Sequence, residues 1–287
     1  MKNQLPIILG CMSWGSWGKK MKPSQMAKLI DQISDLGLRV YDHADIYGDY
    51  TTEAEFGNAL KDASTQRTDI ELISKCGIQM VNDARKTTTK HYDLRKNYII
   101  RSAEQSLKNL QTDYLDTLLI HRPSPLMQAE EIAAAAHQLI QEGKIKHFGV
   151  SNFTASQMAL LSACIDISCN QVEFSLNQSK ILTNGDMDFC MQHNIEVMSW
   201  SPLGSVFDLT YDNKPLKTCL EELSGQYACT MDTLLYAWIL FHPKGIQPVI
   251  GTAQIERMQH AIKATDIQLI QADWFKLWEA SRGQEVD

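Results

Sequence analysis

Four residues that could take part in proton transfer follow three apolar segments of the sequence. Asp42 ends the second apolar segment of the chain, and Tyr47 lies in the stretch directly after it. Lys75 follows the third segment, and His121 follows the fourth. Each alone has an ordinary structural explanation: a capping aspartate, a half-buried loop tyrosine, a surface lysine or a core histidine. Packing alone does not readily explain their joint placement, which indicates a shared site.

Together these side chains suit the reduction of a carbonyl group. Hydride addition to a carbonyl leaves an alkoxide, which needs a proton and prior polarisation of the oxygen. A tyrosine hydroxyl has a pKa of about 10 in water, so it is a poor donor at neutral pH unless a nearby ammonium lowers that pKa. Lys75 could do this, Asp42 could keep Lys75 charged, and His121 could steer the substrate oxygen. Tyr47 is the expected proton donor.

The elements that must position these residues alternate along the chain. Short apolar segments of β-type are separated by longer stretches in which apolar residues recur at helical spacing. The expected strands are Ile7–Cys11, Leu38–Asp42, Ile70–Ser74, Leu115–Ile120, His147–Val150, Asn170–Glu173, Val197–Trp200 and Gln247–Ile250. The expected helices include Ser24–Leu36, Asn97–Leu110, Ala129–Glu142, Ser156–Ala163 and Asp232–Phe241. This alternation indicates βαβ units and a mostly parallel sheet.

Eight such units predict an α/β protein with the (β/α)8 TIM barrel fold. The main alternative is a doubly wound sheet, whose dinucleotide fingerprint is G-x-G-x-x-G between the first strand and helix. Gly10, Gly15 and Gly18 follow the first strand here with a different spacing. In a TIM barrel the active site lies at the C-terminal ends of the strands. The four candidate residues fall at or just beyond such ends.

Composition narrows the organisation of the chain and its partners. The 287 residues are 44% hydrophobic, with glycine and proline scattered singly, which favours one domain over 1–287 rather than two with a linker. The net charge of −7 argues against nucleic acid as the main partner. Seven cysteines without a C-x-x-C pair indicate reduced thiols, not a disulfide framework or a metal site. Without a signal peptide or membrane span, a cytoplasmic location is expected.

Four segments resemble the signatures of the aldo-keto reductase superfamily and occur in the same order. They are Tyr41–Gly48, Ile73–Gly77, Leu119–Pro123 and Gly149–Phe153. The likeness runs from about Leu5 to the end of the chain, and looks closest to bacterial members described only as predicted oxidoreductases. It implies an oxidoreductase that uses NADPH to reduce aldehydes or ketones to alcohols. The catalytic residues that it implies are Tyr47, Asp42, Lys75 and His121.

The resemblance also implies where NADPH would bind. Ser151, Asn152 and Gln171 match residues that hydrogen-bond the nicotinamide carboxamide, and Trp200 matches an aromatic residue stacked on the nicotinamide ring. A loop crossing the pyrophosphate and a turn after the eighth strand complete the expected site. The residues matched there are Ser201, Leu203, Gly204, Ser205, Gly251 and Thr252.

The expected preference for NADPH over NADH depends on the last strand–turn–helix unit. Backbone amides at the start of that helix make an anion site, and Arg257 matches an arginine that meets the adenosine 2′-phosphate. Many family members, however, have a lysine at the position of Gly251. They also have a Glu-Asn pair where this chain has His260 and Ala261. These departures leave open how strict the cofactor preference is and how adenine is held.

The expected substrate is a small carbonyl compound. The predicted pocket walls are Met12, Ser13 and Trp14, with Trp14 as the substrate residue, the segment 76–96 and the loop Val206–Pro215. The segment 76–96 is polar, which suits either a lid over the substrate or a solvated loop. The C-terminal helix expected from Gln271 ends quickly, so we expect a fairly open site.

Two other functions remain open at this point. A barrel of this family could bind NADPH and report its redox state to a partner, with little turnover. Alternatively, Lys75 could form a Schiff base with a carbonyl substrate, which requires an uncharged amine of lowered pKa. The carbonyl reductase is favoured, because it uses the four residues together and gives Trp200 and Arg257 a purpose.

Overall fold

Eight parallel strands close into a barrel in the computed structural model, which describes residues 4–208, 210 and 212–286. Around the barrel the strand order is β1-β10-β9-β8-β7-β6-β3-β2. The strands are β1 (Ile8–Gly10), β2 (Val40–Asp42), β3 (Glu71–Cys76), β6 (Leu115–Ile120), β7 (Ile145–Ser151), β8 (Cys169–Glu173), β9 (Glu196–Trp200) and β10 (Gln247–Ile250). Each contains or overlaps one predicted segment, and the predicted (β/α)8 TIM barrel is confirmed.

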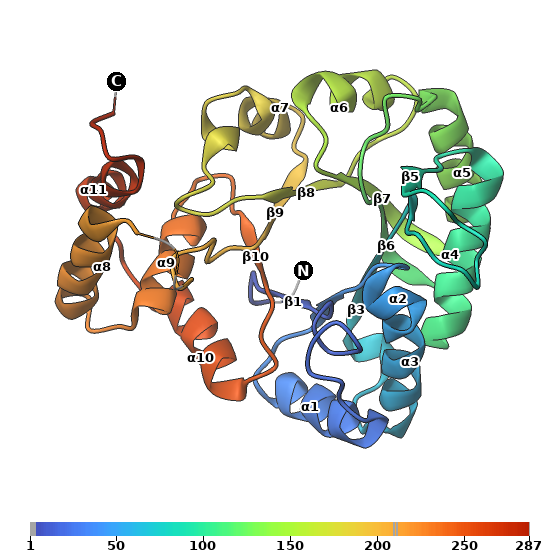
Figure 1. Ribbon diagram of the computed structural model, residues 1–287, viewed down its shortest axis with the longest axis horizontal. Coiled ribbons are helices and arrows are strands. Elements are labelled where there is room, and N and C mark those ends of the chain that lie inside the picture. Colours follow the sequence, from blue (N-terminus) through green and yellow to red (C-terminus); the bar gives the residue numbers. More distant parts are fainter. Residues whose placement is uncertain (1–3, 209, 211, 287) are drawn as a thin grey trace.

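Helices surround the barrel on its outside; most lie between successive barrel strands, and α10 and α11 follow the last strand, β10 (Figure 1). These outer helices are α1 (Pro23–Asp35), α3 (Thr52–Asp62), α4 (Lys96–Leu110), α5 (Ala129–Gln141), α6 (Ala155–Ser162), α7 (Asp186–Gln192), α8 (Lys214–Gln226), α9 (Met231–Leu240) and α10 (Ile255–Lys263). The short α2 (Tyr47–Tyr50) precedes α3, and α11 (Gln271–Arg282) packs beside α8 at one side. The five helices whose ranges were predicted from the sequence are present, each within one residue at both ends.

The sequence analysis did not identify α3, α7 and α8 as helices. In α3, Gly57 lies in the middle of the helix, where glycine weakens helix propensity. The structure explains this glycine, because a Cβ at Gly57 would lie 2.2 Å from the carbonyl oxygen of Asn109 on the neighbouring α4. Gly57 therefore allows the backbones of α3 and α4 to approach closely.

The segment 76–96 forms a small hairpin beside the barrel mouth. Its strands β4 (Ile78–Gln79) and β5 (His91–Tyr92) pair antiparallel, with a further bridge between Asn82 and Thr87. The amide of Met80 donates a hydrogen bond to the hydroxyl of Tyr50, at 2.9 Å. The segment is thus folded against the loop after β2. In the part of the chain that the structure describes, no helix has the length and apolar character needed to cross a bilayer.

Candidate active site

Inside the barrel, an apolar layer is followed two residues later, on several strands, by polar side chains. An apolar layer fills the barrel, made of Ile8, Val40, Ile73, Leu119, Cys169, Met198 and Val249. Side chains alternate between the two faces of a strand, so the residue two positions later also points inward. Those next residues are Gly10, Asp42, Lys75, His121, Gln171, Trp200 and Gly251. Because side chains alternate along each strand, the predicted polar residues lie together in one layer at the C-terminal mouth of the barrel.

Lys75 is the centre of this polar layer. Its Nζ donates to Asp42 Oδ2 at 2.7 Å, to the carbonyl oxygen of His43 at 2.9 Å and to the Tyr47 hydroxyl at 3.0 Å. The side chains of Lys75 and Asp42 are 1% and 3% exposed. Three acceptors satisfy the three donors of the ammonium group. The ring of His121 meets that of Tyr47 edge-on, with centroids 6.1 Å apart.

A sharp backbone reversal places Tyr47 over the barrel. Gly48, Asp49 and Tyr50 have positive φ angles of 59°, 55° and 72°. A Cβ at Gly48 would lie 2.4 Å from Thr52 Oγ1, so glycine is required at that position. Left-handed conformations cost energy in non-glycine residues and are often found at functional sites. The reversal directs the Tyr47 side chain back to Lys75.

Burial and the charges of neighbouring groups together set the pKa values of Tyr47 and Lys75. Burial raises the pKa of Tyr47 above its ordinary value, although Lys75 acts in the opposite direction. Burial disfavours the charge on Lys75, but Asp42 and Tyr47 outweigh it, so the pKa of Lys75 is raised. The lowering effect predicted for Lys75 is therefore present. In the protein alone burial has the larger effect, so the pKa of Tyr47 stays above its ordinary value.

His121 is held in its neutral form. Burial lowers its pKa well below the ordinary value, and the positive charges of Lys75, Arg122 and Lys90 lower it further. A neutral imidazole can still donate one hydrogen bond from a ring nitrogen. The carbonyl oxygen of a substrate could accept that bond.

The amide and hydroxyl groups expected to bind nicotinamide hold one another in place. Ser151 Oγ donates to the carbonyl oxygen of Gln171 at 2.8 Å, and Asn152 Nδ2 donates to Ser151 Oγ at 2.7 Å. Asn152 has a positive φ of 62°. Gln171 Nε2 donates to Asp42 Oδ1 at 2.8 Å. Gln171 therefore links the expected cofactor residues to the Asp42–Lys75 pair, a contact that the sequence analysis did not predict.

Trp200 forms part of the wall beside these groups. Its Nε1 donates to Asn152 Oδ1 at 2.9 Å, which fixes the plane of the indole. Trp200 lines a cavity of about 580 Å³ at the barrel mouth, together with the Tyr47 and His121 side chains. Other residues around this cavity include Met12, Ser13, Trp17, Ile46, Ile78, Met80, Lys90, Tyr92, Arg122, Ser151, Asn152, Gln171, Ser201 and Gly251.

A second cavity of about 710 Å³ adjoins the first and shares Ser201, Pro202 and Gly251 with it. Its other lining residues include Lys19, Leu203, Gly204, Phe207, Asp232, Thr252, Gln254 and Arg257. Ser205 does not line it, because its hydroxyl accepts a hydrogen bond from Asn177 Nδ2 at 2.6 Å. His260 Nδ1 lies 2.8 Å from Asp232 Oδ2. Trp200 thus lines the first cavity and Arg257 the second.

The structure corrects the role predicted for Trp14. Its side chain is 0% exposed and packs in the core against Tyr41 and Phe56. It therefore cannot contact a substrate in this conformation. Trp17, three residues later, is 39% exposed and lines the cavity instead. Of the predicted wall Val206–Pro215, Phe207 faces the second cavity, and Leu209 and Tyr211 lie outside the described residues.

Trp17 was predicted together with Trp14 as an aromatic rim, and Tyr92 lies in the predicted wall 76–96; both line the first cavity. Two other cavity residues, Lys19 and Arg122, were not assigned a role from the sequence, and Lys19 comes from the loop after β1. Arg122 was part of a recognised motif but received no role. A signal was available for Arg122, because it follows His121 at a strand end. No local pattern marks Lys19, since its place depends on how its loop folds.

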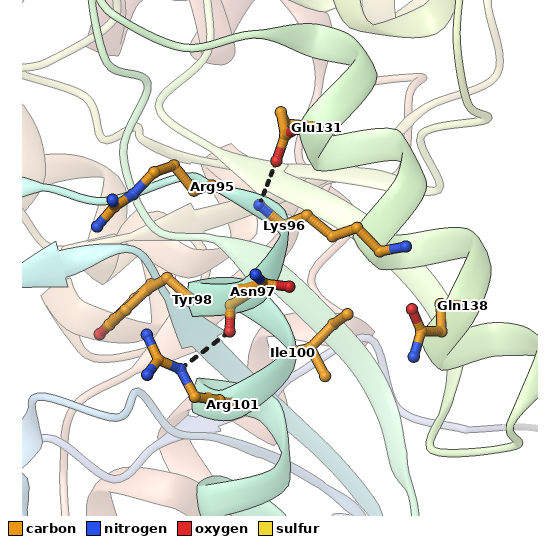
Figure 2. A pocket seen from close by; sticks show the side chains of 8 residues that line it. All are labelled: Arg95, Lys96, Asn97, Tyr98, Ile100, Arg101, Glu131 and Gln138. Atoms are coloured by element: carbon orange, nitrogen blue, oxygen red, sulfur yellow. Dashed lines mark hydrogen bonds between the residues drawn. The ribbon is translucent and has the colours of Figure 1, made fainter.

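Figure 2 shows a further cavity, of about 650 Å³, on the outer surface between α4 and α5. The amide of Lys96 donates to Glu131 Oε2 at 2.8 Å, and Arg101 Nε donates to the carbonyl oxygen of Asn97 at 3.1 Å. None of the predicted catalytic residues lines this cavity. Predicted catalytic residues line the cavity at the barrel mouth instead.

Comparison with known proteins agrees with this fold and site. A sequence profile of the aldo/keto reductase family matches residues 6–282. The chain belongs to the aldo/keto reductase family.

Three relatives are similar over nearly their whole lengths. "Uncharacterized oxidoreductase YcsN" from Bacillus subtilis (strain 168) is 39% identical, over 98% of this chain and 95% of the relative. A "6-dehydroglucose reductase" from Agrobacterium fabrum is 36% identical, over 92% of this chain and 90% of the relative. The crystal structure of an aldo-keto reductase from Klebsiella pneumoniae in complex with NADPH has a TM-score of 0.79 and 28% identity, covering 98% and 92% of the two chains.

Proposed function

We propose that this protein is an NADPH-dependent oxidoreductase that reduces aldehyde or ketone carbonyls to alcohols, with Tyr47 as the proton donor. The observation that carries this proposal is the hydrogen bond between Lys75 Nζ and the Tyr47 hydroxyl, beside a cavity that also contains His121. The same geometry argues against a Schiff base on Lys75. Such chemistry needs an amine of lowered pKa, whereas the pKa of Lys75 is raised.

Each residue of the polar layer has its own role in the proposed reduction. His121, in its neutral form, orients and polarises the carbonyl oxygen by donating a hydrogen bond. Tyr47 gives its hydroxyl proton to that oxygen as negative charge develops there. The ammonium of Lys75 stabilises the tyrosinate that remains, and Asp42 keeps Lys75 charged and in place.

The adjoining cavities fit a dinucleotide cofactor. Ser151, Asn152 and Gln171 present amide and hydroxyl groups suited to a carboxamide, and Trp200 supplies a flat apolar face. Arg257 and Lys19 supply positive charge in the second cavity, where a phosphate would lie. Reduced nicotinamide bound here would supply the hydride. The NADPH complex of the Klebsiella pneumoniae relative supports the choice of this cofactor.

The test of this function is NADPH consumption with a panel of aromatic, aliphatic and sugar aldehydes. A sugar aldehyde belongs in the panel because one relative carries the name 6-dehydroglucose reductase. We expect NADPH oxidation that depends on the aldehyde. Tight NADPH binding without turnover of any carbonyl compound would indicate instead a protein that senses the redox state of the cofactor. Absence of binding would contradict the proposed cofactor site.

Cofactor choice should depend on the two cations of the second cavity. Arg257→Ala and Lys19→Ala each remove a charge that can pair with the 2′-phosphate or pyrophosphate. We expect Arg257→Ala to weaken NADPH binding about tenfold or more, with a much smaller effect on NADH. Titration of tryptophan fluorescence measures both dissociation constants. Lys20→Ala is the control, because it removes the same charge from a neighbouring residue outside the cavity; equal effects in Lys19→Ala and Lys20→Ala would remove Lys19 from the site.

The pH dependence of reduction should be flat near neutrality. The pKa of His121 is lowered well below its ordinary value of 6.5, and that of Tyr47 is raised above 10.0. Neither group therefore changes its protonation between about pH 7 and 9. We expect kcat/KM for a neutral aldehyde to vary less than about twofold across that range. A sigmoidal change centred near neutral pH would show that His121 or Tyr47 titrates there, contrary to this assignment.

A further inference from the structure

Two cations of the first cavity have no task in the reaction described above. Arg122 follows β6 directly after His121, and Lys90 lies in the hairpin just before β5. Both line the 580 Å³ cavity together with Tyr47 and His121. Two separate elements, the end of a barrel strand and the hairpin, therefore bring positive charge to the place where a substrate would lie.

Neither cation has an acidic partner in the part of the chain that the structure describes, where no ion pair involves Arg122 or Lys90. Of the described residues that line the cavity, Asp42 alone is acidic, and its charge is matched by Lys75. By contrast, Arg95 in the same part of the chain is paired with Asp93 at 2.5 Å. The cavity thus carries uncompensated positive charge in a protein whose net charge is −7.

Arg122 is also held in place by its surroundings. Its side chain is half-buried, and the guanidinium carbon lies 5.5 Å from the centre of the Trp200 ring. Packing of a guanidinium on an indole is a favourable cation–π contact. Because Trp200 is itself fixed by Asn152, Arg122 is oriented before any ligand arrives.

These cations lie away from the cofactor phosphates of the proposed function. The second cavity, where the cofactor phosphates would lie, has its own cations, Lys19 and Arg257. Neither Lys90 nor Arg122 lines that cavity. In Figure 1 the hairpin strand β5 and helix α10, which carries Arg257, lie on opposite sides of the barrel. Lys90 and Arg122 therefore belong to the substrate half.

The wall of this cavity also has an apolar part. Met12, Trp17, Ile46, Ile78 and Met80 supply this surface. A ligand that matches the cavity has a carbonyl group at Tyr47, an apolar or aromatic body, and a negative charge at the two cations. The positive charges of Arg122 and Lys90 are also close enough to His121 to lower its pKa, so they act on the same small volume.

We propose that the site selects carbonyl substrates that carry a carboxylate remote from the reacting carbonyl, and that Arg122 and Lys90 bind this group. Arg122 can make a bidentate contact with a carboxylate, and Lys90 can add a second charge-assisted bond from the hairpin. This inference rests on the proposed carbonyl reduction and names the substrate class of the same site. It assigns Arg122 and Lys90 to specificity, not to proton transfer.

The test compares substrates that differ only in this charge. Initial rates with NADPH are measured for para- and meta-formylbenzoate and for the methyl ester of each. We expect kcat/KM for the better of the two carboxylates to exceed that for its neutral ester about tenfold or more. Arg122→Gln should reduce this ratio about tenfold and Lys90→Gln severalfold, mainly through KM.

Lys96→Gln is the matched control. It removes one positive charge from the outer cavity between α4 and α5, where Figure 2 shows the Lys96 side chain; none of the predicted catalytic residues lines that cavity. The ratio should stay at the parent value in this variant. If Lys96→Gln lowered the ratio as much as Arg122→Gln, the preference would come from the overall charge of the protein and not from this site.

A binding measurement separates failure of this inference from failure of the proposed function. The unreactive amide para-carbamoylbenzoate and its methyl ester are titrated, by tryptophan fluorescence, into protein saturated with NADP⁺. Tighter binding of the carboxylate, lost in Arg122→Gln, supports the inference even if the aldehydes tested turn over slowly. Efficient reduction of both the esters and the acids, with equal binding of the two amides, overturns the anionic preference and leaves carbonyl reduction intact.

Discussion

Replacing Tyr47 with phenylalanine should lower kcat for aldehyde reduction by about 10²- to 10⁴-fold, the range typical of a lost general acid. The change removes the hydroxyl that lies 3.0 Å from Lys75 Nζ and keeps the ring that meets His121 edge-on. The cavity beside Ser151, Asn152 and Gln171 is left intact, so the dissociation constant for NADPH should change by less than about twofold. Stopped-flow rates and fluorescence titration measure the two quantities.

Tyr98→Phe is the control for this experiment. Its hydroxyl is buried. It also lies outside both cavities of the barrel mouth. Loss of this hydroxyl should leave kcat and KM unchanged. A Tyr47→Phe protein that kept most of its activity would show that another group protonates the substrate oxygen.

The sequence was sufficient to place the catalytic layer because two regularities coincide. Strands of a TIM barrel end at one mouth, and side chains alternate along each strand. Apolar Val40 and Ile73 are therefore followed by inward-facing Asp42 and Lys75. Such a pattern is local, so it can be read without knowing how the loops fold.

Loop residues were harder to predict, because their positions depend on contacts far away in the sequence. Trp14 and Trp17 lie in the same loop, yet Trp14 enters the core and Trp17 lines the cavity. The direction of each side chain follows from the turn at Gly15–Lys20, which no strand or helix period describes. The net pKa of Tyr47 could not be predicted for a related reason. Residue types reveal the charge of Lys75, but only the folded structure reveals how strongly burial opposes it.

The second large effect concerns the buried pair of Asp42 and Lys75. Removing one member leaves the other charged and buried, which typically costs about 3–5 kcal/mol. We therefore expect Lys75→Met and Asp42→Asn each to lower the free energy of unfolding by about that amount. Urea titration with linear extrapolation measures these losses. Lys146→Gln is the control, because it also breaks a lysine–aspartate pair at 2.8 Å, but from a half-exposed lysine; its cost should be below about 1 kcal/mol.

The double variant Asp42→Asn/Lys75→Met distinguishes stability from activity. With both charges removed, neither position leaves an unpaired charge in the polar layer, so the double variant should lose much less free energy of unfolding than the sum of the two single losses. Turnover should not recover, because Tyr47 still lacks the ammonium group beside its hydroxyl. Recovery of both properties would mean that the charge at Lys75 is not needed for catalysis. Recovery of stability alone would show that the protein maintains a buried ion pair, at a cost in desolvation, in order to keep a positive charge at Tyr47.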